Sequence, residues 1–90
     1  MKKMKNKVLV KLVLPSIEEE FDLYLPLNKS IGKIIDLLKK SLPVITDKRF
    51  EVTNFLNLYN KHTGKKYDLD TVLINTDIRN GSILIFLLIF

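Results

Sequence analysis

A run of eight apolar residues, 83–90, is the feature that most constrains how this chain folds. It directly follows Asn80-Gly81-Ser82, and Asn-Gly between strand-like segments is a strong signal for a tight turn. Eight residues are far fewer than the roughly 20 that a helix needs to cross a bilayer. A short apolar run bounded by a turn is typical of a buried strand. The sequence therefore predicts a small domain that closes on a strand in the middle of its sheet.

The composition indicates one globular domain. The chain has 90 residues, of which 47% are hydrophobic and 28% are charged, which is enough for a single modest core. We expect the domain to span residues 8–90, after a basic and flexible N-terminal arm at residues 1–7. The chain contains no cysteine, which excludes disulfides, thiolate catalysis and cysteine-ligated zinc and fits a reducing compartment.

The first residues superficially resemble a secretion signal, because lysines precede an apolar stretch. Lys11 interrupts that stretch, however, and the chain contains no alanine for a small-residue cleavage site. We therefore predict a cytoplasmic protein.

The formal charge of +5 is concentrated at the N-terminus. Lys2, Lys3, Lys5 and Lys7 supply four of these charges, and the rest of the chain is close to neutral. No stripe of basic residues with interleaved aromatics, as a nucleic-acid site would need, is visible. We interpret the arm as a solubilising terminus, so the residues disfavour a nucleic-acid partner.

The first half of the chain shows a hairpin followed by a helix. Alternation of apolar residues predicts strands at 8–14 and 21–25, joined through residues 15–20. Ser30 is placed to cap a helix, because its hydroxyl can accept a hydrogen bond from a free amide of the first turn. We expect Pro43 to close this helix. Its apolar stripe comprises Ile31, Ile34, Ile35, Leu38 and Leu42.

The second half contains shorter elements. Residues 50–60 are strand-like, and a turn at residues 61–65 leads to a short further strand that begins at Tyr67. Asp70 and Thr71 are placed to cap a helical turn before the final strand. The predicted order is therefore strand, strand, helix, strand, short strand, helical turn, strand.

This order resembles the ubiquitin-like β-grasp over nearly all of residues 8–90. The segment at residues 73–84, Leu-Ile-Asn-Thr-Asp-Ile-Arg-Asn-Gly-Ser-Ile-Leu, is similar to that family's passage from the final turn to the closing strand. The resemblance implies an α+β fold, with a mixed four- to five-stranded sheet and one main helix packed across one face.

Within that superfamily, the chain most resembles the small bacterial YukD-type proteins that accompany type VII secretion systems. A compact domain, a Leu/Ile-rich helix and termination on the closing strand carry this resemblance. It implies a non-enzymatic accessory or regulatory component without a cofactor or a small-molecule substrate. The implied partner is a protein, such as a membrane component of the secretion system, which would hold the domain at the inner face of the membrane.

If the ubiquitin-like alignment holds, Leu84, Phe86 and Leu88 point toward the helix, and the alternate residues of the final strand lie on the opposite face. In the preceding strand, Leu56 and Leu58 lie on one side and Phe55 and Tyr59 on the other. We expect an apolar patch that binds a protein partner, with a homodimer as its simplest form. The predicted patch comprises Leu9, Val13, Phe55, Tyr59, Ile83, Ile85 and Leu87. The alternative is that the chain's own loop or arm covers this face.

No other motif predicts chemistry. His62 is the only histidine, and it lies in a predicted turn without a serine or cysteine at a recognisable spacing. The pair Asp68 and Asp70 lacks the further ligands and the glycine of a calcium loop. We therefore predict no enzyme and assign no catalytic, cofactor-binding or metal-binding residue.

Two alternative functions remain within this fold. A sulfur carrier or conjugated modifier requires a Gly-Gly tail after the last strand, and Phe90 in that place argues against it. A basic nucleic-acid-binding domain would depend on the N-terminal lysines and would bind less tightly as salt rises.

Overall fold

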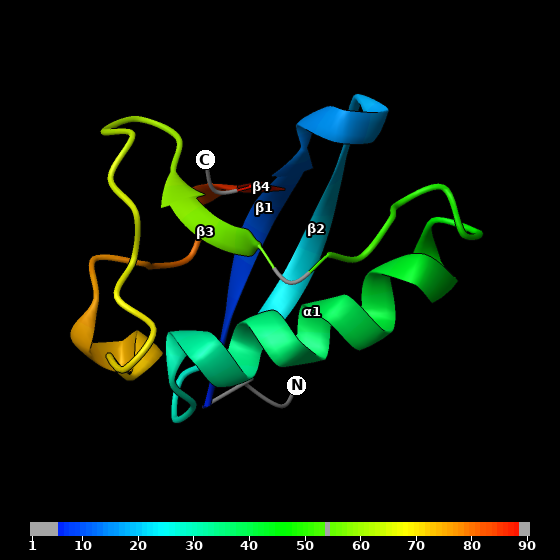
Figure 1. Ribbon diagram of the computed structural model, residues 1–90. Coiled ribbons are helices and arrows are strands. Elements are labelled where there is room, and N and C mark those ends of the chain that lie inside the picture. Colours follow the sequence, from blue (N-terminus) through cyan, green and yellow to red (C-terminus); the bar gives the residue numbers. More distant parts are fainter. Residues whose placement is uncertain (1–5, 54, 89–90) are drawn as a thin grey trace, which may run out of the picture.

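The computed structural model describes residues 6–53 and 55–88, and these form one helix packed on one face of a sheet (Figure 1). The four strands in this part of the chain are β1 (Lys7–Leu14), β2 (Glu19–Pro26), β3 (Leu56–Asn60) and β4 (Ile83–Leu88). The helix α1 comprises Ile31–Ile45, and two 3-10 turns, η1 (Pro15–Ile17) and η2 (Leu73–Asn75), lie in the connections. Residues 1–5 of the predicted arm and residues 89–90 of the predicted final strand lie outside the described residues.

The strand order is β2-β1-β4-β3, so the last strand lies between the first and the third. β4 runs parallel to β1 and antiparallel to β3, while β1 and β2 form the predicted antiparallel hairpin. The turn before β4 is also as predicted, because Gly81 has a φ of 90° and the Ser82 amide donates to the Arg79 carbonyl at 2.9 Å. The predicted mixed sheet with a central closing strand is confirmed, with four strands rather than five in the described residues.

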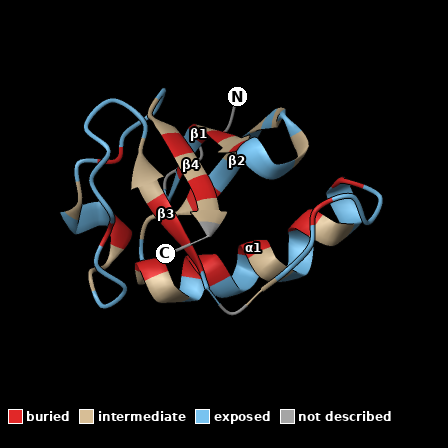
Figure 2. Cartoon of the chain, turned by 45° about the horizontal axis from the view of Figure 1, so that its top comes forward, coloured by how far each residue is buried: buried red, intermediate tan, exposed pale blue. Residues whose placement is uncertain are grey.

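The hydrophobic core fills the space between α1 and the sheet. The predicted stripe on α1 is buried, and so are the side chains of β1 and β4 that face it, as the red segments of Figure 2 show. In β4, Leu84 and Phe86 are fully buried, and the Phe86 ring stacks on Phe50 with the ring centroids 5.7 Å apart. Phe50 lies in the loop after α1, so this stack joins that loop to the central strand.

The start of α1 is fixed by a side chain and by a neighbouring loop. The Ser30 hydroxyl accepts a hydrogen bond from the Lys33 amide at 3.2 Å, which confirms the predicted cap. The amides of Ile31 and Gly32 donate to the carbonyls of Thr71 and Leu69, each at 2.9 Å. A Cβ on Gly32 would lie 3.3 Å from that Leu69 carbonyl oxygen, so glycine permits the close approach.

Two predicted helix boundaries are wrong. Pro43 does not close α1, which continues to Ile45. Proline has no amide hydrogen to donate to the preceding turn, but it does not end the helix here, because the Thr46 amide donates to the Leu42 carbonyl at 2.9 Å. Neither Asp70 nor Thr71 caps η2, because the residue before η2 is Val72 and no side chain makes a capping hydrogen bond there.

The strand predicted at residues 50–60 is also too long, since β3 begins only at Leu56. Phe50 is buried against Phe86, so its burial reflects loop packing and not strand pairing. The short strand predicted at Tyr67 is reduced to an isolated bridge between Lys66 and Tyr59, beside which the Tyr67 amide donates to the Leu58 carbonyl at 3.0 Å.

Tyr67 instead anchors the connection between β3 and β4 through its side chain. Its hydroxyl donates to Oδ1 of Asp77 at 2.7 Å, and Nδ2 of Asn60 donates to the Tyr67 hydroxyl at 3.2 Å and to Oδ2 of Asp77 at 3.3 Å. Burial, together with the hydrogen bond to Asp77, raises the pKa of Tyr67 to about 12. The folded protein therefore holds the phenol proton more tightly than the unfolded chain does.

This linkage predicts a loss of stability at high pH. Because the pKa of Tyr67 is raised on folding, its contribution is complete below the unfolded value near 10 and is lost as pH rises through about 12. We expect the free energy of unfolding to fall over this range more steeply in the wild type than in Tyr67→Phe, as measured by urea unfolding at each pH. At neutral pH, Tyr67→Phe should cost about 1 kcal/mol, because Asp77 loses a hydrogen bond. Equal pH dependence in the two proteins would contradict this assignment.

The register of β4 makes a second prediction. Ile85 is partly exposed on the face away from α1, whereas Leu84 is fully buried beneath it. Ile85→Lys should therefore keep the fold and cost no more than about 1–2 kcal/mol, because a lysine can extend its amine into water. Leu84→Lys should unfold the domain, because it buries a charge without a partner. Circular dichroism and urea unfolding distinguish the two, and unfolding of Ile85→Lys alone would show that the register is wrong.

Candidate interaction surface

The face of the sheet turned away from α1, here called the open face, carries alternate residues of each strand. Strand pairing aligns three predicted site residues in one row across it, because Ile85 lies opposite Val13 on one side and Tyr59 on the other. All three side chains are partly exposed. The structure therefore brings residues from three strands, far apart in the sequence, into one apolar row.

A more polar row lies beside this one. Lys11 is opposite Asp22 on β2 and opposite Ile83 on β4. Its amine lies 3.4 Å from Oε1 of Glu20, the residue opposite Val13, so an exposed ion pair flanks the apolar row. Such a pair contributes little to stability but can restrict which partners fit.

Lys11 also separates two of the predicted residues, because it lies between Leu9 and Val13 along β1. The predicted patch is therefore interrupted along β1 by a charged residue. Leu9 is opposite Tyr24, and these two side chains are 37% and 51% exposed. Sequence reasoning missed Tyr24, although its alternation with Leu23 and Leu25 already places it on the outer face of β2.

Of the remaining predicted residues, only Leu87 belongs to the sheet, at the end of the open face away from Leu9. Leu87 is partly exposed and is paired with Asn57 of β3, whose side chain is buried. Phe55 is 63% exposed but precedes β3, so it is not part of the sheet. An apolar row bordered by charged and polar groups is the usual composition of a protein-binding surface.

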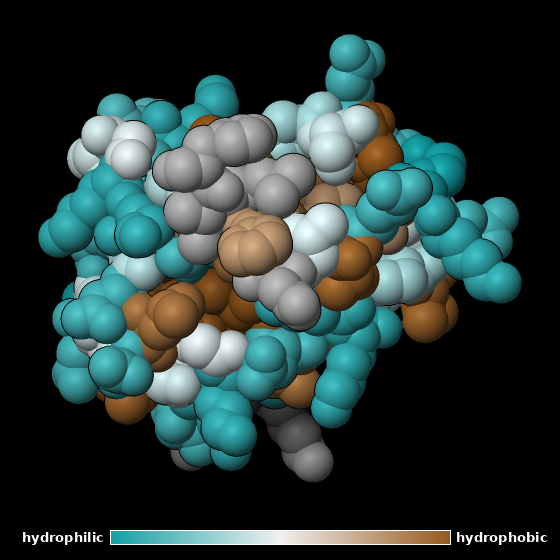
Figure 3. Space-filling model, viewed as in Figure 1, coloured by the Kyte–Doolittle hydropathy of each residue, from teal (hydrophilic) through white to brown (hydrophobic). Residues whose placement is uncertain are grey.

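Apolar side chains also reach other parts of the surface. In the view of Figure 3, several brown side chains lie together left of the centre, bordered by teal ones, and others are exposed elsewhere. The exposed Val44, at 80%, lies on α1, on the other side of the sheet from the open face. Single exposed hydrophobic residues are common on monomeric proteins and need no partner to explain them.

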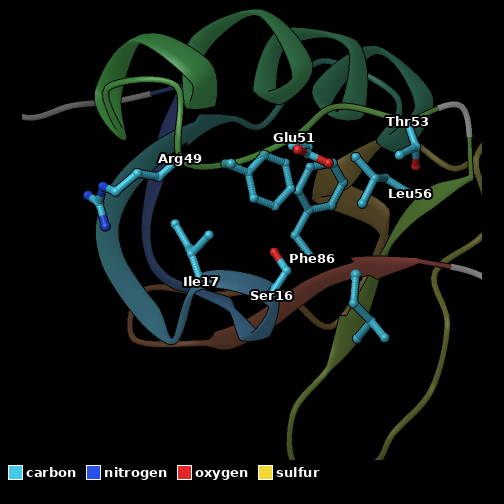
Figure 4. A pocket seen from close by; sticks show the side chains of 9 residues that line it. Ser16, Ile17, Arg49, Glu51, Thr53, Leu56 and Phe86 are labelled. Carbon is cyan, nitrogen blue, oxygen red and sulfur yellow. The ribbon is translucent and has the colours of Figure 1, made fainter.

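A cavity of about 330 Å³ lies between η1, the loop after α1 and the ends of β3 and β4 (Figure 4). Its lining includes the stacked rings of Phe50 and Phe86, together with Ile17, Glu51 and Arg49. The Arg49 guanidinium forms an ion pair with Glu19, and this hydrogen bond raises the pKa of Arg49 above its usual value. None of the described residues that line this cavity is a histidine.

The weak chemical motifs of the sequence have local structural roles. His62 is exposed in the turn after β3, where its amide donates to Oδ1 of Asn60 at 2.8 Å. The Asp68 carboxylate accepts a hydrogen bond from the Asp70 amide at 3.0 Å, which is a local turn and not a ligand cage. Within residues 6–53 and 55–88, no three His, Cys, Asp or Glu side chains gather in a way that could hold a metal ion.

Comparison of the sequence with known families identifies no relative. No family model matches the chain, and no curated protein matches it.

Comparison with solved structures identifies domains of similar fold. The ubiquitin-like domain of the Mycobacterium tuberculosis type VII secretion system protein EccD1 is similar over 89% of this chain and 96% of its own, with a TM-score of 0.71 and 17% identity. A chain of the MycP5-free ESX-5 inner membrane complex is similar over 93% of this chain, with a TM-score of 0.79 and 18% identity. This chain spans only 21% of that ESX-5 chain.

The same fold occurs in an unrelated setting. A chain of the toluene 4-monooxygenase HD complex with the inhibitor 4-bromobenzoate is similar over 91% of this chain and 98% of its own, with a TM-score of 0.71 and 7% identity. At identities this low, the structural similarity establishes the architecture alone, and the function has to be inferred from the surface. The protein therefore has the ubiquitin-like β-grasp fold, the architecture of domains found in type VII secretion components.

Proposed function

We propose that the protein is a non-enzymatic, ubiquitin-like interaction module that serves as an accessory or regulatory component of a bacterial type VII secretion system, as the YukD-type resemblance implies. The observation that carries this proposal is the similarity to two type VII secretion structures, one of which, the EccD1 domain, is matched over 96% of its length. The proposed role rests on binding and not on chemistry.

The open face supports binding to a protein. The row of Val13, Ile85 and Tyr59 offers partly exposed apolar surface from three strands, and Lys11 and Glu20 border it with charges of both signs. Apolar contact supplies affinity, while the flanking charges favour one orientation of the partner. A partner with an apolar centre and a mixed-charge rim fits this surface.

We place the partner among the membrane components of the secretion system. No helix in the described part of the chain is both long and apolar enough to cross a membrane. In this proposal the domain works on the cytoplasmic side and reaches the membrane through its partner. A second copy of the domain bound through the open face is the competing occupant.

An affinity capture from detergent-solubilised membranes of the source organism tests the proposal. Wild type and Ile74→Lys should recover membrane proteins of the type VII system, and Ile85→Lys should recover about tenfold less. Ile74 is the matched control, because it is 55% exposed on η2, outside the sheet, and receives the same substitution. Each variant is first shown to be folded by circular dichroism.

Recovery of the secretion proteins at equal levels by all three proteins would refute the open face as the contact. Recovery of none by the wild type would refute the secretion assignment itself. A wild type that sediments as a dimer, with Ile85→Lys as a monomer, would assign the open face to self-association instead.

A further inference from the structure

The sheet has two edges, and they differ in how far the chain covers them. Along β3, the Asn60 amide donates to the Lys65 carbonyl and the Tyr67 amide donates to the Leu58 carbonyl, so residues 65–67 occupy much of that edge. Along β2, pairing within the described residues is to β1 only. β2 is eight residues long, which is long for an uncovered edge strand.

The hydrogen bonds of the hairpin show which backbone groups of β2 face outward. The Leu27 amide donates to the Asn6 carbonyl at 2.8 Å, just beyond the end of β2. In an antiparallel ladder, residues at every second position bond to the same neighbour, so Leu25, Leu23 and Phe21 also direct their amides and carbonyls toward β1. The amides and carbonyls of Glu20, Asp22 and Tyr24 therefore point away from the sheet.

The β1 side of the ladder agrees with this parity. Leu9 and Lys11 direct their amides toward the β4 end of the sheet, where they donate to Oδ1 of Asn80 and to the Ser82 carbonyl. The even-numbered residues of β1 therefore direct their amides and carbonyls toward β2, which agrees with the alternation along β2.

The two sides of the β2 edge offer different side chains. On the core side, Phe21 and Leu23 are only partly buried, although they pack against the core. Leu37 of α1 is 47% exposed. The opposite flank of α1, with Ile35 and Lys39, lines a groove beside β3, so helical spacing directs Leu37 toward β2. Partly exposed apolar side chains therefore lie beside the free edge of β2, on the side of the sheet that faces α1.

Two acidic side chains of β2, Glu20 and Asp22, lie on the open-face side of the same edge. No lysine or arginine occurs between Lys11 and Lys29, whereas this segment holds Glu18, Glu19, Glu20 and Asp22. Lys11 pairs with Glu20 and Arg49 pairs with Glu19. Pairing of two β2 strands centred on Phe21 or on Asp22 would place carboxylates opposite each other, which disfavours self-association through this edge.

We propose that β2 binds an extended segment of another protein, which adds a fifth strand beside Glu20, Asp22 and Tyr24. The segment alternates basic residues, which lie beside the acidic side chains, with apolar residues, which lie over Phe21, Leu23 and Leu37. Backbone hydrogen bonds supply affinity, and the alternation supplies specificity. This site is separate from the apolar row of the open face.

The test uses a synthetic peptide about eight residues long, the length of β2, that alternates arginine or lysine with valine. Backbone NMR with isotope-labelled protein should show the amides of Glu20, Asp22 and Tyr24 shifting on titration. Their hydrogen exchange should slow, while the amides of Phe21 and Leu23, already bonded to β1, should change little. A peptide with glutamate in place of the basic residues should bind at least about tenfold more weakly.

Two substitutions of Asp22 distinguish the contribution of its backbone amide from that of its carboxylate. Asp22→Pro removes an outward amide and leaves the β1 ladder intact, because proline is tolerated on an edge strand. It should weaken binding of the peptide by at least about tenfold. Asp22→Asn retains the amide and should weaken binding by only about twofold to fivefold, with the difference lost at high salt. Ile85→Lys should bind the peptide like the wild type, which separates this site from the open face.

Peptides with N-methyl groups at alternate positions provide the same test without changing the protein. Methylation of one set of amides should abolish binding, and methylation of the other set should not. Equal effects of both sets, equal binding by Asp22→Pro and the wild type, or no shift of the three amides at about 1 mM peptide would each overturn the proposal. If hydrogen exchange of these three amides slows as the protein concentration rises, without any peptide, the edge binds a second copy of the domain. That result would also overturn the proposal.

Discussion

The insertion of β4 between β1 and β3 is the constraint on which the rest of the structure depends. Without this strand, the hairpin of β1 and β2 would share no backbone pairing with β3. Leu84 and Phe86 then complete the core over α1, and Phe86 also holds the loop after the helix through its stack on Phe50. A single apolar strand therefore joins both halves of the sheet, the helix and a loop.

The same strand determines the surfaces available for binding. Alternation along β4 requires that Ile83 and Ile85 lie on the open face when Leu84 and Phe86 lie in the core. Central placement of β4 also leaves β2 at the outer edge, where nothing in the described part of the chain pairs with its second side. The apolar row and the acidic edge strand are therefore both consequences of one topology, although they offer different chemistry to a partner.

The features that were predictable from sequence are those with a strong local cause. Alternation identified β1 and β2, the apolar stripe and Ser30 identified α1, and Asn80-Gly81 identified the turn into β4. The errors have a different origin. Pro43 lies in the last turn of α1, which continues past it to Ile45, and Phe50 is buried because it stacks on Phe86, 36 positions away. Such effects depend on tertiary packing, which no local pattern records.

The candidate surface was predictable only in part, for the same reason. Alternation along β4 is enough to place Ile83, Ile85 and Leu87 on one face. The row that joins Ile85 to Val13 and Tyr59, however, depends on the register of strands that are distant in the sequence. That register also places Lys11, a charged residue, beside Ile83. The same dependence on register applies to Tyr24, which joins this face because β1 and β2 pair it with Leu9.

The central claim, that the open face contacts a secretion-system protein, is tested most directly by site-specific photo-crosslinking in the source organism. A photoreactive phenylalanine derivative replaces Tyr59 in the apolar row or, as the control, Val44, which is 80% exposed on α1. We expect crosslinks from position 59, and not from position 44, to a membrane component of the type VII system. Crosslinks to that component from position 44 alone, or none from either position, would contradict it.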